Sequence, residues 1–100
     1  EILRMINLYE KDFPKLKKHI KKLATPDYLR SITKQGRKGA APYCGFTSAT
    51  EGSEWIIKCA RHKSKRPLWV LVWGGLEDIA QALHDAPDIQ NKLRIYWNGA

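Results

Sequence analysis

The sequence predicts an α/β fold with a mostly parallel sheet and flanking helices. Residues 68–73 are six consecutive apolar residues, which is typical of a strand buried on both faces of a parallel sheet. Gly74 and Gly75 follow this strand and precede an amphipathic helix at about 76–84. A second strand is expected at 93–97, and the nineteen intervening residues are enough for a parallel crossover through a helix. The two strands and their helix therefore predict a βαβ unit.

Residues 1–32 are predicted to form a basic helical segment. Apolar residues recur at helical spacing through 1–12. Pro14 can occupy the first turn of a second short helix, where its missing N–H costs nothing. Thr25 followed by Pro26 is a typical N-cap and N1 pair, so a third short helix is expected to begin there.

Residues 33–50 contain three glycines and Pro42 and are predicted to form a long exposed loop, a kind of segment that is often functional. A helix capped by Thr50 or Ser53 is expected next, at about 51–62. Residues 51–100 would then comprise this helix and the βαβ unit. The chain starts at Glu1 without a methionine, so we expect residues 1–100 to be one partial domain of a longer protein.

Composition and charge restrict the classes of function. A hydrophobic share of 43% with four tryptophans indicates a folded core. No apolar run approaches the roughly 18 residues that a membrane span needs, so no membrane partner is expected. The net charge of +8 lies mainly in residues 1–40, with eleven Lys or Arg against four Asp or Glu. Within and just after the basic run 15–22, apolar residues recur every three or four positions, which places the lysines together on the opposite face of a helix. This pattern favours a solvated helix face over a nucleic-acid site.

The predicted sheet also locates a candidate site. Ligands of open α/β sheets bind at the carboxyl ends of the strands, where Gly74 and Gly75 lie. The glycine pair could expose its backbone to a ligand or serve only as a tight turn. Trp73 and Trp97 could line this edge or pack in the core. Adjacent Glu77 and Asp78, together with the three histidines, are expected to be surface groups without a catalytic role.

Four separated blocks of the chain form an ordered pattern: TPDYLRSI at 25–32, EGSEWII at 51–57, RPLWVLVWGG at 66–75 and KLRIYW at 92–97. In this order they resemble the nucleoside hydrolase-like domain of cellulose-binding proteins, within the nucleoside hydrolase superfamily. The resemblance implies a central fragment of a nucleoside hydrolase-like α/β domain with a Rossmann-like core. It also implies an extracellular or periplasmic location.

The resemblance further implies a calcium ion that binds sugar hydroxyls and the attacking water. In this chain the backbone carbonyl of Trp73 would be one ligand, whereas the aspartate ligands would lie outside residues 1–100. Gly74, Gly75, Trp97 and Asn98 would contact the substrate. Two departures from the family pattern, Glu77-Asp78 after the first turn and Asn98-Gly99-Ala100 at the second, leave the preference for nucleosides open.

Three functions stay open at this stage. The first is a fragment of a domain that hydrolyses an N-glycosidic bond of a nucleoside or related sugar, active only when full-length. The second is a non-catalytic carbohydrate-binding or accessory domain. The third is a basic nucleic-acid-binding module. A nucleoside or carbohydrate ligand is expected, nucleic acid is disfavoured, and self-association through uncovered sheet edges stays open.

Overall fold

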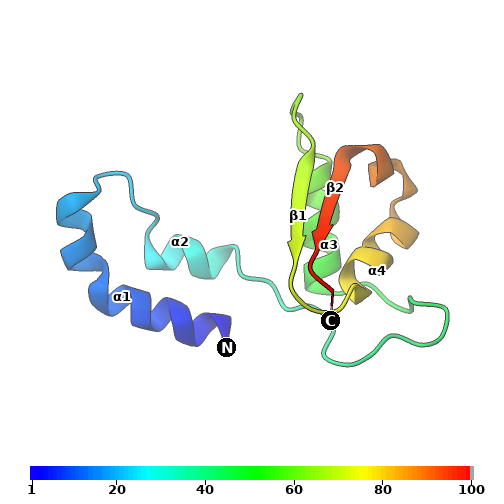
Figure 1. Cartoon of the computed structure of the whole chain (residues 1–100), viewed down its shortest axis with the longest axis horizontal. Coiled ribbons are helices and arrows are strands. Elements are labelled where there is room, and N and C mark those ends of the chain that lie inside the picture. The colour runs from blue at the N-terminus through cyan, green and yellow to red at the C-terminus, as the bar shows by residue number, and fades with distance from the viewer. Residues whose placement is uncertain (100) are drawn as a thin grey trace. The chain divides into compact units, whose positions relative to one another are not determined.

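The computed structural model describes residues 1–99. They divide into two compact units, Glu1–Lys34 and the residues from Gln35 onward (Figure 1). The first unit contains two helices, α1 (Ile2–His19) and α2 (Pro26–Ser31). The second contains α3 (Glu51–Ala60), β1 (Leu68–Val72), α4 (Glu77–Asp85), the 3-10 helix η1 (Pro87–Lys92) and β2 (Leu93–Trp97). Ala100 of the predicted second turn lies outside the described residues.

The prediction of two helices before residue 24 is wrong, because α1 continues through Pro14 as one helix of 18 residues. A proline inside a helix removes one backbone hydrogen bond and bends the axis without always ending the helix. Figure 1 shows such a bend in α1. Ile6 is buried on α1, whereas Met5 and Ile20 are exposed within residues 1–34.

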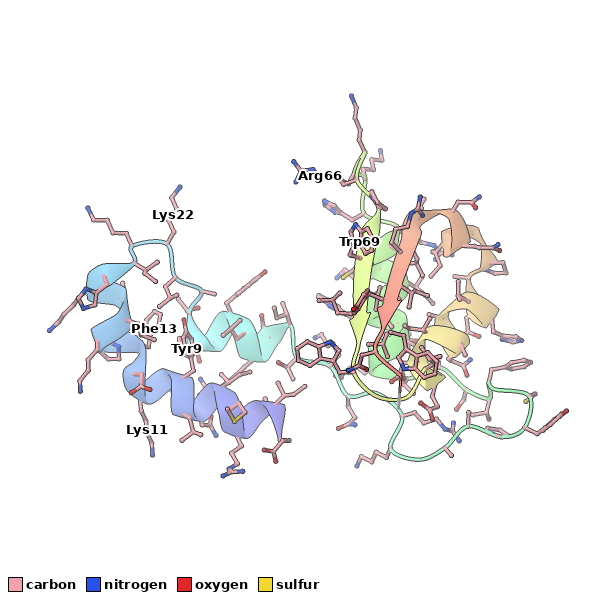
Figure 2. The ribbon with its side chains drawn as sticks, in the orientation of Figure 1. Tyr9, Lys11, Phe13, Lys22, Arg66 and Trp69 are labelled. Atoms are coloured by element: carbon pink, nitrogen blue, oxygen red, sulfur yellow. The ribbon has the colours of Figure 1, made fainter. Side chains whose placement is uncertain are left out.

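Polar contacts join α1 to the α2 region in the first unit. The Tyr9 hydroxyl donates to the Ala24 carbonyl at 2.6 Å, and Tyr9 also packs edge-on against Phe13 (Figure 2). Arg30 of α2 forms an ion pair with Glu10 of α1, and this contact lowers the pKa of Glu10. Thr25 caps α2 by accepting a hydrogen bond from the Tyr28 N–H, which confirms the predicted cap.

In the second unit, β1 and β2 pair in parallel, with Leu68 opposite Leu93 and Val72 opposite Trp97. Paired residues of parallel strands point to the same face of the sheet. α3, α4 and η1 pack on the face that Leu68 and Leu93 occupy. The buried core there comprises Ala60, Ala82, Ala86, Ile89 and Leu93.

The prediction that β1 is buried on both faces is wrong for residues 1–99. Trp69, Leu71 and Tyr96 share the other face of the sheet and are 63%, 64% and 61% exposed. α3 and α4 both contact the core face, so within the described residues one face of the sheet is covered and the other is open. Within the described residues, β1 therefore buries the apolar side chains of one face and leaves those of the other face exposed to solvent.

The remaining boundaries agree closely with the predicted elements. Thr50 and Ser53 form a capping box at the start of α3, in which each side chain accepts from the other residue's backbone N–H at 2.9 Å. Residues 33–50 contain no helix or strand, as predicted. Among residues 1–99, no helix combines the length and the hydropathy of a membrane span.

Candidate functional site

The carboxyl ends of the two strands bring together most of the predicted site residues. The indole N–H of Trp97 donates to the Gly74 carbonyl at 2.9 Å, which joins the turn after β1 to the end of β2. The backbone N–H of Asn98 donates to the Val72 carbonyl at 3.3 Å. With its amide oriented to satisfy both of its groups, the Asn98 side chain donates to the same carbonyl at 3.1 Å. Gly74, Trp97 and Asn98 thus form one connected edge.

Trp73 lies at this edge with its side chain 79% exposed, so it is not a core residue of the described chain. Trp97 is 47% exposed and shares the core face with Val72. A large exposed aromatic surface beside backbone and amide groups suits a ligand that carries both apolar and polar faces. The two tryptophans therefore differ in role, since Trp97 fastens the edge and Trp73 is available to a ligand.

The two glycines of the turn differ in their surroundings. A Cβ added at Gly74 would meet no other atom within 4 Å, whereas one added at Gly75 would overlap the Glu77 carboxylate. Neither has a positive φ, while Gly99 in the second turn has a φ of 82°. Packing within residues 1–99 therefore does not require glycine at position 74, where the space beside the Cα is empty although the carbonyl accepts from Trp97.

The segment 35–50 is fastened to α4 by side chains that sequence analysis assigned to the surface. Asp78 accepts from the Arg37 N–H at 3.1 Å and from the Thr50 hydroxyl at 2.6 Å. The prediction that Asp78 is only a surface charge is wrong, because this carboxylate accepts from a backbone N–H near the start of the loop and from a side-chain hydroxyl at its end. Its signal was weak, since one carboxylate in a first helical turn is equally typical of a surface charge.

Gln81, one turn further along α4, is 4% exposed and accepts from the Thr47 N–H at 2.8 Å. Its amide nitrogen donates to the Asp85 carboxylate at 2.9 Å. That bond and the neighbouring His84 lower the pKa of Asp85. Phe46 also stacks on the His84 imidazole with ring centroids 3.6 Å apart. The polar face of α4 thus binds and positions the loop 35–50. Sequence analysis did not predict this role.

The described residues offer few of the oxygen donors that calcium requires. Ca²⁺ takes six to eight oxygen ligands, of which carboxylates are the most common. The Trp73 carbonyl is a single neutral donor, and residues 1–99 contain no group of three His, Cys, Asp or Glu side chains able to hold a metal. The described residues by themselves therefore do not fit the ion.

A parallel βαβ unit with its carboxyl-end turns brought together is typical of the α/β class, and comparison with known proteins defines the class further. The chain belongs to the family described as cellulose-binding Sde182, nucleoside hydrolase-like domain, which it matches over residues 1–100. This confirms the resemblance drawn from the sequence blocks.

One solved structure with a closely similar fold is a nucleoside hydrolase-related hypothetical protein from Saccharophagus degradans that is associated with carbohydrate metabolism. The two chains share 32% sequence identity with a TM-score of 0.81 over 94% of this chain. The match spans only 25% of that protein, so this chain corresponds to about a quarter of its relative. No curated protein sequence matches the chain.

Proposed function

We propose that the edge formed by Trp73, Gly74, Gly75, Trp97 and Asn98 binds a carbohydrate, and that this chain supplies a binding surface without catalytic groups. The observation that carries this proposal is the Trp97–Gly74 hydrogen bond, which fixes the two strand ends beside a tryptophan that is 79% exposed. The cellulose-binding description of the family and the relative's association with carbohydrate metabolism support a sugar ligand. A location outside the cytoplasm, where polysaccharides are encountered, belongs to the same proposal.

The chemistry of the edge favours binding over catalysis. A sugar ring presents C–H groups on its faces and hydroxyls around its rim, so an exposed indole and nearby amide or carbonyl groups complement it. General acid–base cleavage of a glycoside requires two carboxyl groups that face each other across the substrate. The two carboxylates that follow the turn after β1 are not arranged as such a pair. The Glu77 carboxylate lies next to Gly75, and the Asp78 carboxylate is hydrogen-bonded to Thr50 of the loop.

The test is titration calorimetry of the full chain with cellohexaose. We expect Trp73→Ala to lower the affinity at least tenfold, because it removes the exposed aromatic surface. Trp69→Ala is the matched control, since Trp69 is also exposed, at 63%, but lies near the start of β1 (Figure 2). Equal losses of affinity in both variants, or a larger loss in Trp69→Ala, would contradict the proposed edge and indicate that the sugar binds on the open face of the sheet.

A second candidate is N-glycoside hydrolysis by a longer protein that contains this chain. The nucleoside hydrolase-like fold and the position of the Trp73 carbonyl at a strand end favour it. Calcium-dependent release of base from nucleosides by the longer protein would support this candidate. Cellohexaose binding that survives EDTA, together with no turnover of nucleosides, would support the binding role instead.

A further inference from the structure

A second concave site lies at the opposite ends of the strands, where β1 and β2 begin. A hollow of about 480 Å³ opens between the turn after α3 and the start of β2. Its walls come from 59–68 and 91–94. Figure 2 shows Arg66 at this amino end of β1, away from the turn that follows the strand. The hollow is therefore separate from the proposed carbohydrate edge.

The lining of this hollow is strongly basic. Residues 41–100 contain seven Lys or Arg, and six of them line it: Arg61, Lys63, Lys65, Arg66, Lys92 and Arg94. The same segment contains six Asp or Glu, none of which is among the lining residues. A segment that is almost neutral in sum thus concentrates its positive charge at one end of the sheet.

Two of the six cations donate to acceptors within the chain, Arg94 to the Leu93 carbonyl at 2.9 Å and Arg61 to Asp88. The Arg61 guanidinium forms two hydrogen bonds to the Asp88 carboxylate, at 2.8 and 3.1 Å. The pairing fixes the end of α3 against η1, at the base of the basic turn. Ser64 accepts a hydrogen bond from the Arg66 N–H at 3.1 Å, which shapes the turn itself. No carboxylate lies among the described lining residues, so the positive charge gathered there would attract a small anion.

We propose that this hollow, the basic hollow, binds a small phosphorylated sugar. A phosphate monoester carries nearly two negative charges and three acceptor oxygens, so it can neutralise several cations at once. The guanidinium groups of Arg66 and Arg94 can donate hydrogen bonds to the phosphate oxygens, and the lysine ammonium groups add positive charge. Ser64 and Asn91 provide polar groups for sugar hydroxyls. The volume lies within the range of small-molecule sites.

Two features separate this ligand class from single-stranded nucleic acid. The described lining residues include no Phe, Tyr or Trp and offer His62 as their one aromatic ring, whereas proteins that bind single strands stack successive bases on several aromatic rings. The hollow also draws its cations from one turn and the start of one strand, so the charges surround a single small volume. The basic run of α1, which sequence analysis weighed as a polyanion site, lies in the other unit on an exposed helix face.

The test compares glucose 6-phosphate with glucose and glucuronate by amide chemical-shift mapping of the full chain at low ionic strength. We expect saturable shifts with glucose 6-phosphate, confined to residues 61–68 and 91–94. Glucose should give none there, and glucuronate should bind at least tenfold more weakly because it carries one charge. Shifts spread over all basic segments would overturn the proposal, as would glucuronate binding of equal strength.

Variants of equal net charge provide the control. The double variant Lys65→Gln/Arg66→Gln should weaken glucose 6-phosphate binding at least tenfold, whereas Lys17→Gln/Lys18→Gln on α1 should change it less than twofold. Similar losses in both would mean non-specific attraction. Oligouridylate that binds more than tenfold tighter than glucose 6-phosphate, and is lost in the first variant, would make the hollow a nucleic-acid site. The shift mapping needs no variant and stands if one fails to fold.

Discussion

The Asp78 carboxylate in the first turn of α4 accepts a hydrogen bond of 2.6 Å from the hydroxyl of Thr50, the N-cap of α3. This bond connects the starts of two helices that pack on the same face of the sheet. Because Asp78 also accepts from the Arg37 N–H, the same side chain fixes the loop that precedes α3. The loop is therefore positioned by the helix that follows the candidate carbohydrate edge.

Removal of this carboxylate should loosen the loop. We expect Asp78→Ala to reduce the free energy of unfolding of the second unit by about 1–3 kcal/mol, because it leaves partly buried donors unpaired. Hydrogen exchange should accelerate at Arg37 before it does in the core. Asp78→Asn, which keeps one acceptor oxygen, should lose less. Unchanged exchange at Arg37 in the Ala variant would contradict this role.

Gly36 and Gly39 in the same loop should respond differently to alanine. A Cβ at Gly36 would overlap the Asp78 carboxylate, whereas one at Gly39 meets nothing within 4 Å. We expect Gly36→Ala to destabilise the second unit by about 1–3 kcal/mol through overpacking. Gly39→Ala should be neutral or slightly stabilising, because it restricts the unfolded chain. Urea unfolding of both variants distinguishes these outcomes, and equal midpoints would argue against the loop contact.

Two leucines test whether only one face of the sheet is covered in this chain. Leu93 on the core face is 6% exposed and Leu71 on the open face is 64% exposed. We expect Leu93→Ala to cost about 2–4 kcal/mol in unfolding free energy and Leu71→Ala less than about 1 kcal/mol. Chemical denaturation at several protein concentrations is the measurement. A large, concentration-dependent loss in Leu71→Ala would show that copies of the chain cover this face in solution.

The Arg61–Asp88 pair should make stability depend on pH in the acid range. Hydrogen bonding from Arg61 lowers the pKa of Asp88 in the folded state. Its unfolded-state pKa is about 3.9, so the pair contributes stability above about pH 4 and loses it as the pH falls through the lower folded value. Unfolding midpoints measured from neutral pH downwards should show a smaller acid-induced drop in Arg61→Gln. Asp85 and Glu10, whose pKa values are also lowered, contribute to the acid-range dependence that remains in this variant.

Trp97→Phe isolates the hydrogen bond that fastens the candidate edge. The change keeps an aromatic ring but removes the N–H that donates to the Gly74 carbonyl. We expect a loss of about 0.5–1.5 kcal/mol in unfolding free energy, together with faster hydrogen exchange in the turn after β1. Cellohexaose affinity should fall less than in Trp73→Ala. A stable variant with an unchanged turn would show that the indole N–H does not fix this edge.

Local pattern in the sequence was sufficient for the type of most elements and for the family. The apolar run at 68–73, the Thr25-Pro26 pair and the Thr50/Ser53 cap each act within a few residues, so their structures follow from nearby chemistry. The parallel pairing of β1 and β2 also followed from the length of the connection between them.

The tertiary structure decided what these elements touch. It placed both covering helices on one face of the sheet, so half of an apolar strand stays open in this chain. It turned Asp78 from an expected surface charge into the anchor of a distant loop. It also gathered six cations from two separate segments into one hollow. Such contacts join residues far apart in the chain, and no local periodicity or propensity encodes which distant groups will meet.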